Sequence, residues 1–183
     1  MKRIVRLLRE LAIRVFVVAW PRTRVEGIQL YDLTFRDRLS NADLLRVSKA
    51  LRLIRTTTAW VYSGLIRRMP RIIVAEAGGP EFVPSAKACI INSAHLRSAK
   101  TEDLALLFIH EATHARIWNR GIGYPVTLRS RIEELCVEAE VSWARRLPGG
   151  HDLAAEASKK LSRPWWHPSQ EVERHERQTR ELQ

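Results

Sequence analysis

The pattern of apolar and polar residues divides the chain into several helices and a few short strands. Apolar residues that recur every three or four positions, with Gly or Pro after them, indicate helices. Such segments span 41–68, with a break at the threonines 56–58, then 101–120, 125–147 and 152–161. Short apolar runs between turn residues predict strands at Gly27–Tyr31, Arg71–Ala77 and Lys87–Asn92. We therefore expect a mainly α fold with a small sheet, of the α+β class.

Residues 1–21 differ in character from the rest of the chain. Apolar residues recur there at helical spacing among basic ones until Pro21, which predicts an N-terminal amphipathic basic helix. Charged residues such as Arg9 and Arg14 interrupt the apolar run that a signal peptide or a membrane span would need. Residues 3–19 either pack on the domain or lie on an anionic membrane surface, and we favour packing.

The rest of the chain divides into one domain and a polar C-terminal segment. A length of 183 residues suits a single domain, which we place at residues 22–161. Residues 162–183 are polar and form a tail or an exposed helix. Trp165 and Trp166 in this segment either clamp the tail to the domain or line a cleft.

Charge and cysteine usage narrow the partners and the compartment. The chain has 31 Lys and Arg residues against 20 Asp and Glu residues, a formal net charge of +11. Such a basic surface suits an anionic partner, which includes nucleic acid, an anionic membrane or an acidic protein. Cys89 and Cys136 each lie in an apolar stretch, where a buried free thiol is expected. Two buried thiols favour a reducing compartment, so we expect a cytoplasmic protein, with peripheral membrane contact as the alternative.

The most apolar predicted helix carries an H-E-x-x-H pattern, from His110 to His114. Positions i and i+4 share one helix face, so both imidazoles can bind one tetrahedral Zn²⁺. Glu111 cannot bind the same ion, but it can reach a water molecule beside the ion and take its proton. Burying these side chains without a cation would be costly. We therefore predict Zn²⁺ as the cofactor, His110 and His114 as metal ligands and Glu111 as the catalytic base.

This helix resembles the active-site helix of the zincin metallopeptidases. Ile117 and Arg120 stand where the metzincin branch has glycine and histidine, which excludes that branch. In the gluzincin branch the third ligand is a glutamate on a following helix, and the next predicted helix here contains RIEELCVEAE. HEATHAR followed by R-x-E-x-x-C also resembles uncharacterised bacterial proteins. The resemblance covers residues 87–147 and implies a minimal zincin-like domain, in which the motif helix packs on a short sheet and on the Glu-bearing helix. The strand Lys87–Asn92 would then be the edge strand of the sheet that holds an extended peptide beside the zinc.

The helical phase of residues 129–144 bears on which glutamate is the third ligand. With Ile132 at 0° and a rotation of 100° per residue, the apolar stripe centres near Ile132. Glu133 then lies at about 100°, on the border of the stripe, and Glu134 at about 200°, nearly opposite. We therefore choose Glu133 and keep Glu134 as the alternative, since gluzincins often carry a second acid four residues after the ligand and Glu138 follows Glu134 at that spacing. If Glu133 is the ligand, Glu140 becomes the candidate for supporting a ligand through a hydrogen bond.

Two functions follow as hypotheses. The first is a zinc-dependent hydrolase, a metallopeptidase acting on a peptide or protein substrate. It would also need a hydrogen-bond donor for the negative charge that develops on the substrate, for which Tyr124, His95 and His151 are the candidates. The second is a non-catalytic or latent metal-binding module that uses its basic surface to bind nucleic acid, a membrane surface or a protein.

Overall fold

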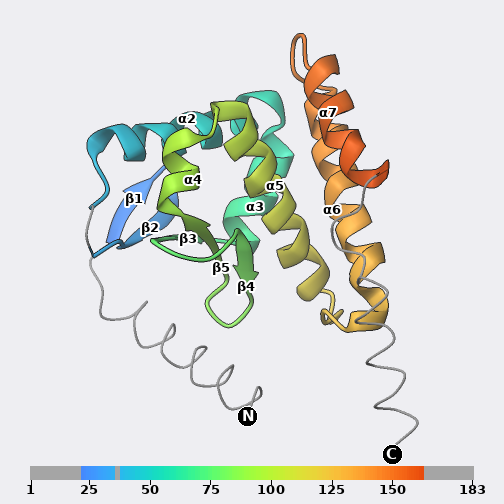
Figure 1. Cartoon of the computed structure of the whole chain (residues 1–183), viewed down its shortest axis with the longest axis horizontal. Helices are drawn as coiled ribbons and strands as arrows, with labels where there is room; N and C mark the ends of the chain where they lie inside the picture. Colours follow the sequence, from blue (N-terminus) through green and yellow to red (C-terminus); the bar gives the residue numbers. More distant parts are fainter. Residues whose placement is uncertain (1–21, 36–37, 163–183) are drawn as a thin grey trace, which may run out of the picture.

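Five short strands form one mixed sheet in the part of the chain that the computed structural model describes, residues 22–35 and 38–162 (Figure 1). The strands are β1 Arg22–Val25, β2 Ile28–Leu33, β3 Arg71–Ala75, β4 Glu81–Val83 and β5 Ala88–Asn92. Their order across the sheet is β1-β2-β3-β5-β4. The three inner strands run parallel to one another, and β1 and β4 run antiparallel to their neighbours.

Six α-helices and one short 3₁₀ helix complete the described chain. They are α2 Asn41–Thr57, α3 Ala59–Arg68, α4 Ser93–Ser98, α5 Thr101–Trp118, η1 Val126–Leu128, α6 Arg129–Ala144 and α7 His151–Ser162. The helices α2 and α3 connect β2 to the parallel strand β3, which needs a long crossover of this kind.

The central strand β3 is buried on both faces of the sheet. Side chains alternate along a strand, so neighbouring residues point to opposite faces. Ile72 and Val74 join the main core with residues of α2 and α5, whereas Ile73 joins a smaller cluster with Tyr31 and Ala88. The continuous apolar run of β3 is therefore the pattern of an inner parallel strand.

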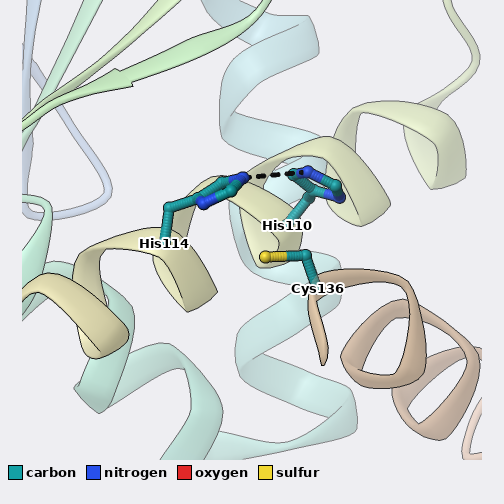
Figure 2. Close-up of side chains that lie close together, drawn as sticks. All are labelled: His110, His114 and Cys136. Atoms are coloured by element: carbon teal, nitrogen blue, oxygen red, sulfur yellow. Dashed lines mark hydrogen bonds between the residues drawn. The ribbon is translucent and has the colours of Figure 1, made fainter. Parts of the chain in front are cut away.

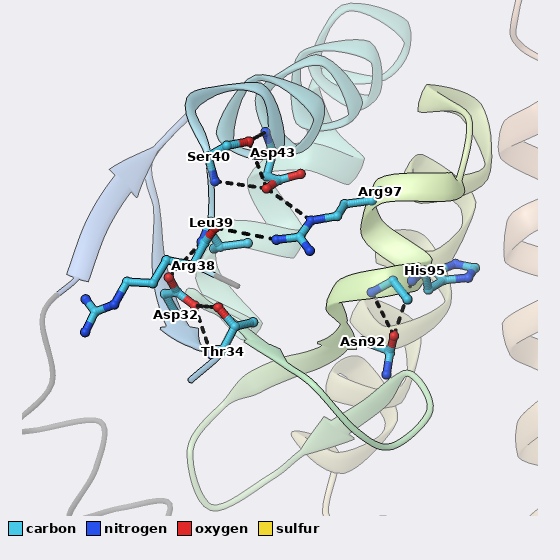
Figure 3. Close-up of polar contacts among 10 residues, drawn as sticks. Asp32, Thr34, Arg38, Leu39, Ser40, Asp43, Asn92, His95 and Arg97 are labelled. Atoms are coloured by element: carbon cyan, nitrogen blue, oxygen red, sulfur yellow. Dashed lines mark hydrogen bonds and ion pairs between the residues drawn. The ribbon is translucent and has the colours of Figure 1, made fainter. Parts of the chain in front are cut away.

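Local capping fixes where α2 begins and ends. The Ser40 hydroxyl accepts a hydrogen bond from the Asp43 N–H at 3.2 Å, and the Asp43 carboxylate accepts one from the Ser40 N–H at 2.9 Å. Arg97 of α4 reaches the same carboxylate at 3.4 Å and so connects the two helices (Figure 3). At the other end Thr58, with φ −153°, interrupts the helical path and separates α2 from α3.

The helix α5 lies at the centre of the fold. It packs against α2 and α3, touches β4 and β5, and contacts α6 through another face, while α7 packs on α6 (Figure 1). Leu104, Ala105 and Phe108 have no exposed surface. Contacts around most of its circumference explain why this segment is the most apolar of the chain.

The mainly α, α+β fold expected from the sequence is confirmed, with the motif helix packed on the sheet and on the following Glu-bearing helix. The three predicted strands correspond to β2, β3 and β5. The prediction missed β1, β4 and α4, which are too short to give a clear periodic signal. The expectation that Lys87–Asn92 is the edge strand is wrong, because β5 lies between β3 and β4. The predicted N-terminal helix at 3–19, Trp165, Trp166 and the segment 163–183 lie outside the described residues.

Among the described helices, none combines the length and the apolar character that crossing a membrane requires.

The capping box at the start of α2 gives a direct test of the fold. Ser40→Ala removes one of its two reciprocal hydrogen bonds and should lower the free energy of unfolding by about 1 kcal/mol. Ser63→Ala is the matched control, because the Ser63 hydroxyl is exposed and only bonds a carbonyl one turn earlier in α3. Urea unfolding of both variants measures the difference, and equal stability would contradict the capping role.

Candidate metal centre

The contact between α5 and α6 brings the H-E-x-x-H motif together with acidic side chains. His110 and His114, one turn apart on α5, point toward α6. Glu133 on α6 faces them, with Oε2 3.2 Å from His110 Nε2 and Oε1 3.6 Å from His114 Nε2. The two Nε2 atoms are 3.2 Å apart (Figure 2). Three potential ligands from two helices therefore converge on one point.

These three separations fit a tetrahedral zinc ion. Bonds of about 2.0–2.1 Å to nitrogen and oxygen place neighbouring ligand atoms about 3.3 Å apart. The observed distances of 3.2, 3.2 and 3.6 Å lie close to that value. Two imidazoles and a carboxylate are also a donor set that zinc commonly binds. The residues present therefore fit the metal that the motif implies.

A second carboxylate fixes the orientation of His110. Glu140 on α6 has Oε1 2.6 Å from His110 Nδ1, and its Oε2 lies 2.6 Å from the Lys160 ammonium on α7. With Nδ1 engaged, the opposite nitrogen Nε2 is the one that faces the cluster, as in the carboxylate–histidine pairs of metal sites. Glu140 is only 1% exposed, so the ammonium of Lys160 and the imidazole of His110 together offset its burial.

Glu111 lies on a different side of α5, against the sheet. Its side chain is buried, and the backbone N–H of Phe82 in β4 donates a hydrogen bond to the carboxylate. The atom Oε2 has no hydrogen-bond partner among the described residues. Burial raises the pKa of Glu111 to about 7, and the charge of Glu133 adds to the rise while His110 opposes it. A carboxylate with a pKa near neutrality suits a general base.

The loop between α5 and η1 adds an aromatic donor. The hydroxyl of Tyr124 donates a hydrogen bond to Glu133 Oε1, and its ring stands edge-on to the ring of His114 with centroids 5.5 Å apart. Burial and the neighbouring carboxylate both raise the pKa of Tyr124, so the hydroxyl keeps its proton. Of the three donors considered from the sequence, this is the one that contacts the cluster.

The protonation states of the three potential ligands are coupled. Burial lowers the pKa of His110, but hydrogen bonds to Glu133 and Glu140 outweigh it and raise the pKa to about 9. Burial and the charge of His110 lower the pKa of His114 to about 4. Burial opposes ionisation of Glu133, yet hydrogen bonds from His110 and Tyr124 hold its pKa below the usual value. A metal ion would therefore have to displace a proton from His110.

Other candidates from the sequence lie away from the cluster. Glu134 forms an ion pair with Arg131 at 3.1 Å, and Glu138 approaches the same arginine at 3.6 Å on the exposed side of α6. His95 on α4 is exposed and lies beside the Asn92 cap (Figure 3). His151 is exposed at the start of α7. None of the contacts among the described residues joins either histidine to the cluster.

The structure adds Cys136 to the group. Its Sγ and one ring nitrogen each of His110 and His114 all lie within 4.8 Å of one another (Figure 2). Sequence reasoning treated this thiol only as a buried core residue. The available signal was its spacing, since Cys136 follows Glu133 by three positions and side chains at that separation share a helix face.

Comparison with protein-family models, with curated proteins and with solved structures finds no match to this chain. A proposal for the function therefore rests on the geometry of the site.

Without metal, the stability of the protein should fall as the pH rises from 7.5 to 9. The pKa of His110 is raised from 6.5 to about 9. A basic group whose pKa is raised by folding stabilises the fold fully when the pH is below its pKa in the unfolded state. This stabilisation is lost as the pH rises through its pKa in the folded state. We expect the free energy of unfolding to fall by an amount on the order of 1–2 kcal/mol over this range. Deprotonation of Glu111 lowers it slightly further near pH 7.5.

Urea unfolding in the presence of a chelator measures this dependence. His110→Gln should remove about half of the slope, because the imidazole is gone while the two cysteines, whose pKa values burial raises, still contribute. His151→Gln should keep the slope, since that histidine is exposed at the start of α7. Equal slopes in the wild type and both variants would contradict the coupling of His110 to its two carboxylates.

Proposed function

We propose that the protein is a zinc-dependent hydrolase, a metallopeptidase with its site at the α5–α6 contact. The observation that carries this proposal is the position of Glu111. Its carboxylate is buried between β4 and the ligand cluster, and Oε2 has no hydrogen-bond partner among the described residues. A site that only holds a metal does not need such a base, and an unpaired buried acceptor is unfavourable. The burial of Glu111 and its raised pKa therefore support a role in accepting the proton of an attacking water molecule.

The proposed roles divide among four side chains. His110, His114 and Glu133 would hold Zn²⁺, with the ligand Glu134 of the alternative hypothesis pointing instead to Arg131. When bound, zinc supplies a Lewis acid that polarises the substrate carbonyl and acidifies water. Glu111 takes the proton of the attacking water and passes it to the leaving amine.

Tyr124 and Glu140 support these residues. The hydroxyl of Tyr124 can donate to the oxygen on which negative charge develops, a role that needs the protonated phenol it retains. Glu140 holds His110 through Nδ1 and thereby keeps Nε2 directed at the cluster. The contact of Glu140 with His110 is present in the described structure, whereas Tyr124 would have to turn its hydroxyl from Glu133 to the substrate.

The strand β4 is the candidate for holding an extended substrate. It is an outer strand of the sheet, and through Phe82 it contacts the proposed base directly. An outer strand can pair with the backbone of a peptide, which gives affinity with little sequence specificity. The role that the resemblance implied for Lys87–Asn92 therefore passes to β4.

The second candidate function is a metal-binding module without catalysis. The observation that favours it is Cys136, a further protein donor beside the histidines. The net charge of +11 would allow such a module to attract an anionic partner. Cytoplasmic localisation stays an expectation from the two free buried thiols.

Glu111→Gln separates the two functions. The amide cannot accept a proton, so hydrolysis of a proteome-derived peptide library should fall by about 100-fold or more. Zinc content should stay at the wild-type value, because Glu111 is not among the proposed ligands. Glu102→Gln, at an exposed position of the same helix, is the control and should change neither quantity. If Glu111→Gln lost as much zinc as His110→Ala, the proposed role of Glu111 as a base that does not bind the metal would be wrong.

Glu133→Gln and Glu134→Gln distinguish the two candidate ligands. Replacing Glu133 should weaken zinc binding by at least roughly 10-fold and remove most of the rise in melting temperature that zinc causes, since metal binding stabilises the folded state. Replacing Glu134 should change both little, because its carboxylate pairs with Arg131 at the surface. Zinc titration and thermal unfolding measure the two effects. Zinc loss in Glu134→Gln but not in Glu133→Gln would mean that α6 is rotated about its axis by about 100° from the orientation described.

A further inference from the structure

We propose that Cys136 is a fourth metal ligand, which closes the centre in the resting protein. The ligation is inferred from the described side chains alone. The consequence that the closed form is a latent hydrolase rests on the proposed function.

The first support is the direction and burial of the Cys136 side chain. It extends from α6 toward the two imidazoles of α5 and has no exposed surface (Figure 2). The sulfur and one ring nitrogen of each histidine lie within 4.8 Å of one another. In a tetrahedral site with a Zn–S bond of about 2.3 Å, sulfur and nitrogen ligands stand roughly 3.5 Å apart. A movement of roughly 1 Å would therefore bring the sulfur into coordination.

The second support is the spacing of donors on both helices. His110 and His114 are four residues apart, and Glu133 and Cys136 are three apart. Both separations put two side chains on one helix face, and helical bundles use the same i, i+3 spacing for pairs of metal ligands. The facing helices α5 and α6 can thus supply two ligands each. Four protein ligands are typical of closed zinc sites, whereas catalytic sites keep one position for water or substrate.

The other cysteine shows that burial alone does not make a ligand. Cys89 on β5 is equally buried, but its sulfur contacts the carbonyl of Ile90 at 3.5 Å, and it does not belong to the donor group. Cys89 therefore provides a matched control, because it has the same chemistry and burial in another place.

Ligation by Cys136 has two consequences. A thiolate favours zinc, cobalt or cadmium over magnesium, manganese or calcium, so it makes the site more selective among metal ions. It also occupies the position that a reacting water needs. Opening the centre then requires the thiolate to leave and take up one proton while a water molecule takes its place.

Cobalt substitution of the full-length protein tests this ligation directly. The wild type loaded with one Co²⁺ per chain should show a thiolate-to-cobalt charge-transfer band in the near ultraviolet. Cys89→Ser should keep the band. Cys136→Ser and Cys136→Ala should lose it, still bind one metal ion, and bind zinc with an affinity lower by roughly 10- to 100-fold. A band in the wild type that persists in Cys89→Ser assigns the thiolate to Cys136, so poor folding of a Cys136 variant does not leave the ligation untested.

The outcomes also separate this inference from the proposed function. A cobalt-loaded wild type without the band, or a band that survives in Cys136→Ser, overturns the ligation while leaving a His₂Glu hydrolase in place. A band with no hydrolysis in the wild type or in either Cys136 variant upholds the ligation and contradicts the hydrolase. A band together with peptide hydrolysis that rises about 10-fold in Cys136→Ser supports the latent enzyme, because serine is a weaker zinc ligand than cysteine.

Discussion

Burial of ionisable groups at one helix contact is the constraint on which this structure depends. Glu111, Glu133 and Glu140 are each at most 4% exposed, and two imidazoles lie among them. Removing such charges from water costs several kcal/mol for each unpaired ion. Without metal, the proton on His110 links Glu133 and Glu140 and offsets part of this cost. A divalent cation at the same point would neutralise the group more completely, so we interpret the α5–α6 contact as a metal centre.

The fold keeps the α5–α6 contact in place because α5 is packed on two sides. The sheet and the helices α2 and α3 bury its apolar residues, and β4 meets Glu111 through the backbone of Phe82. The pair α6 and α7 closes the other side, where Lys160 of α7 balances the charge of Glu140. The proposed base and the potential ligands thus come from adjacent faces of one helix. Neither set can move without disturbing a packed neighbour, which keeps the polar groups in register.

The sequence predicts the long elements and the central residues of the site for clear physical reasons. Helical periodicity places His110 and His114 on one face, and the phase of α6 favours Glu133 over Glu134 before any contact is known. Short elements such as β4 lack enough residues for a periodic signal, so the strand that meets Glu111 was missed. The pairings of Tyr124 with Glu133 and of Lys160 with Glu140 depend on tertiary packing across loops and helices. Cys136 was overlooked because an apolar neighbourhood suits a core thiol and a metal ligand equally well.

The most direct test of the account is a crystal structure of the zinc-loaded protein, with anomalous scattering measured on both sides of the zinc absorption edge. We predict one strong anomalous peak per chain, within about 2.0–2.3 Å of the Nε2 atoms of His110 and His114 and of a carboxylate oxygen of Glu133. A chain that takes up no zinc, or a peak bound by other residues, would contradict the central claim that the α5–α6 contact is a metal centre.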